Sequence, residues 1–305
     1  MDISLALGGG GTKGYSHIGV IKVLEHEGFN IKAIAGTSAG GLIGALYLAG
    51  FSPEAIKKQM AELDQKKLYG HAEGEQPSLL GLSGITEMLT KVLGDLTFAE
   101  LPIPFAVTAV DLNSGEPVVI QEGSVLEAVL ATIAIPGILP PRLRGDELLV
   151  DGGVSNPVPV DIVKELCPNV PVVAVVLSQE PGTPSAPAHL QIENESPVLE
   201  RLTRLKVAQA LNIFLRSLDV SSRLLAEMRL EIDNPDVILR PDVSSIGILD
   251  RVDVEEIVLL GEVATLKQLN NIHRAVRWTS RVGKFIGIDK MMRRIKERNR
   301  DETRS

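Results

Sequence analysis

Gly36-Thr37-Ser38-Ala39-Gly40 is the stretch of this 305-residue chain that decides its fold. The pentapeptide follows an apolar run, residues 31–35, that predicts a buried strand, and it precedes another, residues 41–49, that predicts a helix. A G-x-S-x-G sequence between a strand and a helix is typical of a nucleophile elbow, a tight turn that exposes the serine hydroxyl. Because five-residue matches also occur by chance in ordinary turns, the elbow needs support from other motifs.

A glycine-rich loop, Gly8 to Gly14 (GGGGTKG), joins a predicted strand over residues 3–7 to a predicted helix over residues 15–27. A dinucleotide-binding G-x-G-x-x-G loop requires an acidic residue at the end of the second strand, where this chain has Gly36. A phosphate-binding Walker A loop requires lysine directly after its last glycine, where this chain has Tyr15. The dinucleotide interpretation therefore lacks its acidic residue, and the Walker A interpretation fails.

The remaining interpretation of the glycine loop is an oxyanion hole. Successive backbone N–H groups without side chains can surround a developing negative charge, and here they would be those of Gly9, Gly10 and Gly11. Adjacent parallel strands place the loops that follow them at the same edge of a sheet. We therefore expect this loop to lie beside Ser38.

A serine needs a general base to act as a nucleophile at neutral pH. Three histidines follow Ser38: His71 in a polar loop, His189 in a linker-like segment and His273 on a basic helix. None of them follows a predicted strand that would return it to the serine. On the first helix, we expect His17 to be packed or capping and His26 to be solvated. The sequence therefore disfavours a Ser-His-Asp triad.

Asp151-Gly152-Gly153 offers a different base. The aspartate ends a predicted strand, residues 148–150, and the glycines allow close approach of another backbone segment. A plain Asp-Gly turn is the alternative. If it lies beside Ser38, Asp151 can accept the hydroxyl proton directly, as half of a Ser-Asp dyad.

The order of predicted elements indicates an α/β fold. Strand and helix alternate from residue 3 to residue 49, which predicts a parallel sheet with helices on both faces. Residues 69–94 form either an apolar flap over the site or, as we favour, a loop and a short helix packed on the core. Later segments predict helices over 52–67, 124–132, 157–166, 198–230 and 253–274, hairpins around 113–115 and 145–146, strands over 170–177 and 237–240, and a linker over 179–197.

The composition excludes several classes of protein. Hydrophobic residues make up 44% of the chain, which indicates a globular protein, and aromatic residues make up only 3%, which argues against a nucleic-acid partner. The single cysteine, Cys167, fits a reducing compartment. No signal sequence is evident at Met1, and the apolar runs are too short to span a bilayer. We therefore expect a cytoplasmic protein.

The three motifs together resemble those of the patatin-like phospholipase family, G-G-G-x-[KR]-G, G-x-S-x-G and D-G-[GA]. They occur in that order at Gly9–Gly14, Gly36–Gly40 and Asp151–Gly153. Further segments resemble the family or its bacterial branch: 111–115, 134–141, Asn156-Pro157, Pro159 and 239–250. Thr12 is a small departure, because the family often has a small apolar residue there.

The resemblance implies a three-layer α/β/α domain with a mainly parallel central sheet and a helical C-terminal extension. The resemblance covers a catalytic domain over 1–178, to which composition and residue pattern add a linker over 179–197 and a helical region over 198–305 that packs on or extends the domain. It also implies lipid acyl-hydrolase or carboxylesterase activity without cofactor or metal. The residues implied are Ser38 as nucleophile, Asp151 as base, the amides of Gly9, Gly10 and Gly11 as oxyanion hole, and the motif glycines Gly14, Gly36, Gly40, Gly152 and Gly153.

Two other functions stay open from the sequence: an α/β-hydrolase with a histidine base, and a non-catalytic lipid- or nucleotide-binding regulator on the same fold. A further hypothesis concerns the tail. From His273 onward the chain has 11 Lys and Arg against four Asp and Glu, although the whole chain carries −8. Residues 277–300 form either an interfacial helix at the inner face of the membrane or, as we slightly favour, a packing helix with a solvated basic face.

Overall fold

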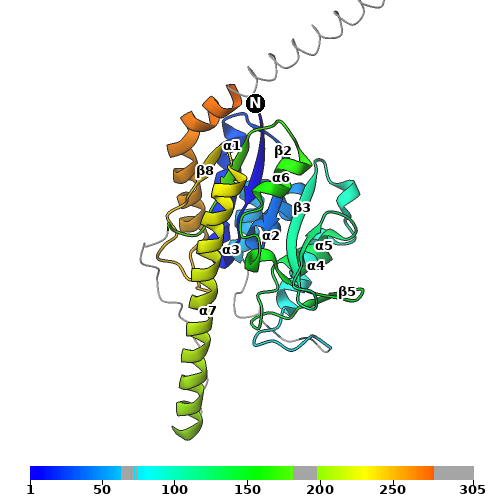
Figure 1. Ribbon diagram of the computed structural model, residues 1–305, viewed down its shortest axis with the longest axis vertical. Coiled ribbons are helices and arrows are strands. Elements are labelled where there is room, and N and C mark those ends of the chain that lie inside the picture. The colour runs from blue at the N-terminus through cyan, green and yellow to red at the C-terminus, as the bar shows by residue number, and fades with distance from the viewer. Residues whose placement is uncertain (63–69, 71, 73, 181–197, 278–305) are drawn as a thin grey trace, which may run out of the picture.

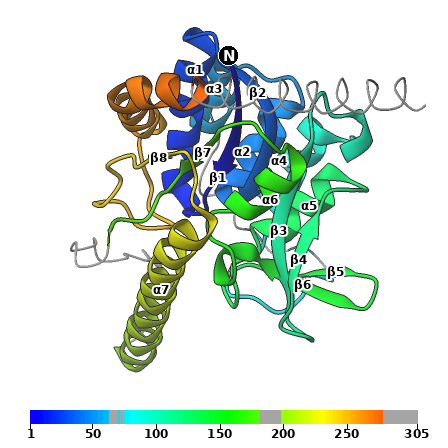
Figure 2. The same cartoon turned by 45° about the horizontal axis from the view of Figure 1, so that its top comes forward.

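The structure is a computed structural model of the chain, and it describes residues 1–62, 70, 72, 74–180 and 198–277. Its centre is an eight-stranded sheet (Figure 1), with strands in the order β5-β6-β3-β2-β1-β7-β8 and β4 paired to β3 (Figure 2 labels all eight). The strands are β1 (Asp2–Leu7), β2 (Asn30–Thr37), β3 (Phe105–Asp111), β4 (Pro117–Ile120), β5 (Arg142–Arg144), β6 (Glu147–Asp151), β7 (Val172–Val175) and β8 (Val237–Leu239).

Most of the sheet is parallel, as the alternation of strand and helix predicts. The five strands β3, β2, β1, β7 and β8 pair in parallel, whereas β4, β5 and β6 add antiparallel pairs at the β3 side. Every residue of β3 is buried, and so is β1 after its first residue. A strand buried on both sides must be covered on both faces of the sheet.

Helices supply that cover in two layers. On one face of the sheet, larger side chains such as Leu5 and Val107 pack against a layer that includes helices α1, α2 and α5. On the other face, small side chains such as Ala6 and Ala35 pack against helices α6 and α7. The three-layer α/β/α prediction is therefore confirmed. The helices are α1 (Ser16–His26), α2 (Ala39–Leu48), α3 (Pro53–Glu62), α4 (Ser83–Leu93), α5 (Val125–Thr132), α6 (Val160–Leu166), α7 (Val198–Asp233) and an unlabelled one over 254–277.

The C-terminal region adds to this body at several places. Strand β8 extends the sheet beside β7, in register from Val173–Val237 to Val175–Leu239. Helix 254–277, orange in the figures, runs beside α1 (Figures 1 and 2), and the absence of side chains at Gly19 and Gly261 allows the two backbones to meet. The first part of α7 extends away from the sheet, and its second part returns to it (Figure 2). No helix within the described ranges is long and apolar enough to cross a membrane.

Two predicted elements differ from the structure in informative ways. The helix predicted from residue 157 begins only at Val160, because a residue before proline is pushed out of the helical region and Val158 precedes Pro159. Residues 83–93 of the glycine-punctuated segment form α4, whose Leu89 and Leu93 are buried. This agrees with a short helix packed on the core. The tail 278–305 lies outside the described residues.

Candidate active site

Ser38 lies at the turn between β2 and α2. Its backbone has φ 53° and ψ −122°, a left-handed conformation that costs free energy for any residue with a side chain. A hydrogen bond from the Ser38 N–H to the Thr132 hydroxyl, 2.8 Å long, holds the turn from α5. A Cβ at Gly36 would strike the backbone of Gly40 and Gly41, so the tight strand-to-helix turn requires glycine there.

Asp151 ends β6, which pairs with β3, the neighbour of β2. The sheet therefore brings Asp151 to the elbow, where its side chain lies close enough to the Ser38 hydroxyl to interact with it and accepts a 2.8 Å hydrogen bond from the Gly153 N–H. Both Ser38 and Asp151 are only 6% exposed. Burial raises the pKa of Asp151 to about 6, although the interactions with Ser38 and Gly153 oppose the rise.

A chain of buried hydroxyls fixes the two loops relative to each other. The Thr37 hydroxyl donates to the carbonyl of Asn156 at 2.8 Å, so it must accept the 2.7 Å hydrogen bond from the Thr108 hydroxyl. Thr37 precedes Ser38, and Asn156 follows the Asp151 turn. Three adjacent segments, the end of β2, the middle of β3 and the loop after β6, are thereby tied together around the serine and the aspartate. Gly152 has no room for a Cβ against Thr108.

The glycine loop lies beside Ser38 as expected, but its amides are not equivalent. The Gly8 N–H donates to Val175 and the Gly9 N–H donates to Pro157, each at 3.0 Å. Neither the Gly10 nor the Gly11 N–H donates to an acceptor within the described residues. Gly11 has φ +59°, and a Cβ there would strike Ile248, so only glycine fits this position.

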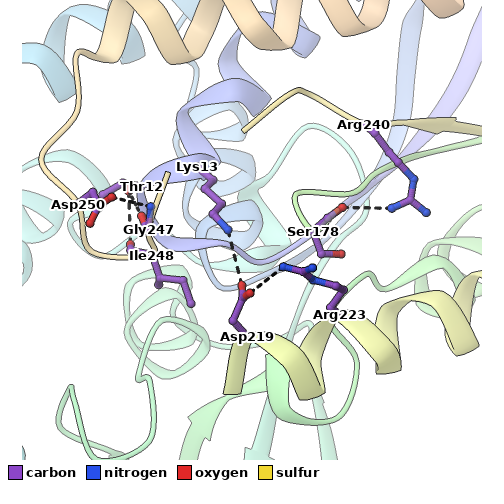
Figure 3. A network of polar contacts seen from close by, with 9 residues as sticks. All are labelled: Thr12, Lys13, Ser178, Asp219, Arg223, Arg240, Gly247, Ile248 and Asp250. Atoms are coloured by element: carbon purple, nitrogen blue, oxygen red, sulfur yellow. Dashed lines mark hydrogen bonds and ion pairs between the residues drawn. The ribbon is translucent and has the colours of Figure 1, made fainter. Parts of the chain in front are cut away.

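The C-terminal region holds the glycine loop from outside (Figure 3). Thr12 donates its N–H to the carbonyl of Ile248 and its hydroxyl to that of Gly247, both at 3.0 Å. The ammonium of Lys13, only 7% exposed, lies 3.6 Å from the carboxylate of Asp219 on α7. A second contact, 3.1 Å long, joins that carboxylate to the guanidinium of Arg223. Sequence reasoning missed these contacts, since no local pattern links residue 13 to residue 219.

Helix α7 also forms one wall of the cavity at Ser38. This cavity, about 290 Å³, is lined by the elbow, the glycine loop and the Asp151 turn. The side of α7 facing it contributes both apolar and polar residues: Leu215, Leu218, Asp219, Ser221, Ser222 and Leu225. Arg240 links this helix to the segment that follows β7. Its guanidinium donates to the Ser178 carbonyl at 3.1 Å (Figure 3) and to the carboxylate of Glu227 on α7 at 2.7 Å.

The histidines of the described chain lie elsewhere. His17 is fully buried, and its Nε2 lies 2.8 Å from the Gly8 carbonyl, so this nitrogen carries the proton. Burial lowers the pKa of His17 to about 4, which leaves the ring neutral. His26 is exposed, and His273 packs beside Phe29 with ring centroids 5.0 Å apart. No described histidine lines the cavity at Ser38; His71 and His189 are outside the described residues.

Comparisons with known proteins identify the family of the chain. The sequence model described as Patatin-like phospholipase matches residues 5–164. An uncharacterized NTE family protein of Mycobacterium tuberculosis is 35% identical over 160 residues, 52% of this chain and 44% of the relative. Human patatin-like phospholipase domain-containing protein 6 is 33% identical over 189 residues, 58% of this chain and 14% of the relative. The chain therefore belongs to the patatin-like phospholipase family, and it spans less than half the length of these relatives.

A solved structure shows the same fold. The crystal structure of VipD from Legionella pneumophila superposes with a TM-score of 0.56 at 15% identity, covering 90% of this chain and 67% of VipD. At this identity the likeness concerns the fold alone. Because the match covers 90% of the chain, it extends beyond the segment matched by the family model.

Proposed function

We propose that the protein is a serine hydrolase that cleaves carboxylic ester bonds of lipids through a Ser38–Asp151 dyad. Membership of the patatin-like phospholipase family supports a lipid hydrolase in general. One observation carries the finer proposal: the buried Asp151 carboxylate lines the same cavity as Ser38, which is held in a strained elbow. Burial also raises the pKa of Asp151 to about 6. A base near this pKa is ionised at neutral pH yet still accepts a proton readily.

In the first step, Asp151 takes the hydroxyl proton while the Ser38 oxygen bonds to the ester carbonyl carbon. The carbonyl electron pair moves onto oxygen, and the N–H groups of Gly10 and Gly11 stabilise the resulting oxyanion. Gly9 contributes differently, since its N–H already fixes the loop to Pro157. The oxyanion collapses, the bond to the leaving oxygen breaks, and Asp151 passes its proton to that oxygen. Water then repeats the sequence on the acyl-enzyme.

Ester hydrolysis by wild type and two variants tests the proposal. We expect wild type to hydrolyse a short p-nitrophenyl ester, and Ser38→Ala and Asp151→Asn to lose at least about a thousandfold in kcat, as removal of a nucleophile or its base does in serine hydrolases. An active Ser38→Ala protein would contradict the proposal. Ligand binding without turnover by wild type would favour the non-catalytic regulator instead.

A further inference from the structure

Ser38 lies where two cavities meet. The first is the one beneath α7. The second is lined by residues of α2, α3 and α4, and the two share Ser38, Gly11, Ile135 and Ile248 in their walls. An ester bound at Ser38 therefore has two directions in which its two halves can extend.

The second cavity is apolar. It lies between α2, α3 and α4, with Leu42 from the first, Met60 from the second, and Ile85 and Met88 from the third. No charged side chain lines it among the described residues. Methionine is adaptable and fills irregular space, which suits a wall that must accommodate flexible hydrocarbon. Such a cavity favours an alkyl chain over a polar group.

The first cavity has a different chemistry. Lys13, Asp151 and Asp219 line it, together with hydroxyls at Ser178, Ser221 and Ser222. Its leucines from α7 add apolar surface, so it offers both hydrogen-bonding and hydrocarbon contacts. This combination suits an alcohol that carries polar groups, whereas the second cavity offers such groups little.

The position of the base decides which half of the ester enters which cavity. Asp151 lines the first cavity and not the second. During acyl transfer, the group that protonates the leaving oxygen must lie within hydrogen-bond reach of it. The leaving alcohol must therefore extend on the Asp151 side, which directs the acyl chain to the opposite side of Ser38.

We propose that the cavity between α2, α3 and α4 binds the acyl chain and that the cavity beneath α7 binds the alcohol. This assignment rests on the proposed function. It predicts that acyl chain length is selected by α4, the helix of the glycine-punctuated segment. Each methylene buried in an apolar cavity raises kcat/KM by up to about fourfold, so the acyl preference should rise with length until the cavity is filled.

A pair of isomeric esters tests the assignment. Ethyl hexanoate and hexyl acetate contain the same atoms, but the long chain is on the acyl side in one and on the alcohol side in the other. We would measure kcat/KM for both with wild type and three tryptophan variants: Met88→Trp in the second cavity, Leu218→Trp in the first, and Met228→Trp on the exposed side of α7 as control.

The expected readout is the ratio of kcat/KM for ethyl hexanoate to that for hexyl acetate. Met88→Trp should lower this ratio at least about tenfold, because it removes space for two or more methylenes. Leu218→Trp should raise it, and the control should leave it within about twofold of wild type. Ile85→Phe, also in α4, replaces Met88→Trp if thermal unfolding shows that the latter does not fold.

Two results would overturn the assignment alone: an unchanged ratio in active cavity variants, or shifts in the opposite directions. Absence of hydrolysis of both esters by wild type, with no fluorophosphonate labelling of Ser38, would overturn the proposed function and the assignment with it. Labelling of Ser38 in wild type therefore distinguishes a failure of the cavity assignment from a failure of the proposed hydrolase function.

Discussion

At the scale of single residues, burial of the Asp151 carboxylate lowers the stability of the fold at neutral pH and suits the carboxylate to its proposed role as a base. Burial disfavours its charged form and raises its pKa to about 6. The same burial brings the carboxylate near the proton affinity that a base needs at neutral pH. Sites of this kind trade stability for activity.

One prediction at this scale concerns activity. Asp151 must be ionised to accept the Ser38 proton, so kcat/KM should be constant above about pH 7 and fall tenfold per pH unit well below pH 6. Ester hydrolysis between pH 4.5 and 8.5 checks this, with circular dichroism at each pH to confirm folding. An acid limb with a midpoint near 4, the ordinary range of aspartate, would contradict the buried-base interpretation.

A second prediction concerns stability. A folded-state pKa raised above the unfolded value means that stability falls as the pH rises from about 4 through about 6. Asp151→Asn removes the buried charge but keeps an oxygen for the Gly153 N–H. It should therefore raise the free energy of unfolding at pH 8 by up to about 3 kcal/mol, and by much less at pH 4. Urea unfolding at both pH values tests this, with Glu231→Gln, which replaces an exposed acidic residue of α7, as the control; equal effects of Asp151→Asn at both pH values would contradict it.

At the scale of elements, contacts with α7 and with residues 247–248 hold the glycine loop that contains the proposed oxyanion donors. Lys13 is buried next to Asp219, and Thr12 is fixed by Gly247 and Ile248. The donors Gly10 and Gly11 lie immediately before these anchored residues. We therefore expect helix α7 to influence the proposed reaction through the loop.

Asp219→Asn tests this coupling. Loss of the carboxylate leaves the Lys13 ammonium buried without its partner, which is costly and should displace the loop. We expect kcat to fall by about tenfold with a smaller change in KM, since oxyanion donors act mainly in the transition state. Asp219→Glu should recover part of the loss. Glu231→Gln, an exposed acidic residue of the same helix, is the matched control; a purely structural role would lower thermal stability and leave the kcat of folded enzyme unchanged.

The elements also show what local sequence can and cannot predict. The elbow and the glycine loop were predictable because each depends on small residues within five or seven positions. The start of α6 was not, since the helical pattern from residue 157 concealed the effect of Pro159 on Val158. The wall formed by α7 was not predictable either, because the contact between Lys13 and Asp219 joins positions far apart in the chain. The amphipathic pattern of a helix predicts which of its sides is buried, but it does not identify the segment against which that side packs.

At the scale of the whole molecule, the C-terminal region is part of the unit that holds the site. It contributes β8 to the sheet, Ile248 to both cavities and helix 254–277 to the cover of α1. The family model ends at residue 164, before all of these. We propose that residues 1–178 do not form an independent catalytic domain.

Truncation tests this proposal. A chain of residues 1–178 would expose the edge of β7 and remove the wall of the first cavity, so we expect it to aggregate or to lack cooperative unfolding and esterase activity. A chain of residues 1–277, which keeps the described C-terminal elements, is the control and should retain the activity of the full chain. A soluble 1–178 chain with full esterase activity would contradict the proposal.

The central claim is that Ser38 is a nucleophile activated by Asp151. The most direct measurement is labelling with a fluorophosphonate, followed by peptide mass spectrometry to locate the adduct. We predict a single adduct on Ser38 in wild type, at least about a hundredfold slower labelling in Asp151→Asn, and none in Ser38→Ala. An adduct on another residue, or equal labelling rates in wild type and Asp151→Asn, would contradict the dyad.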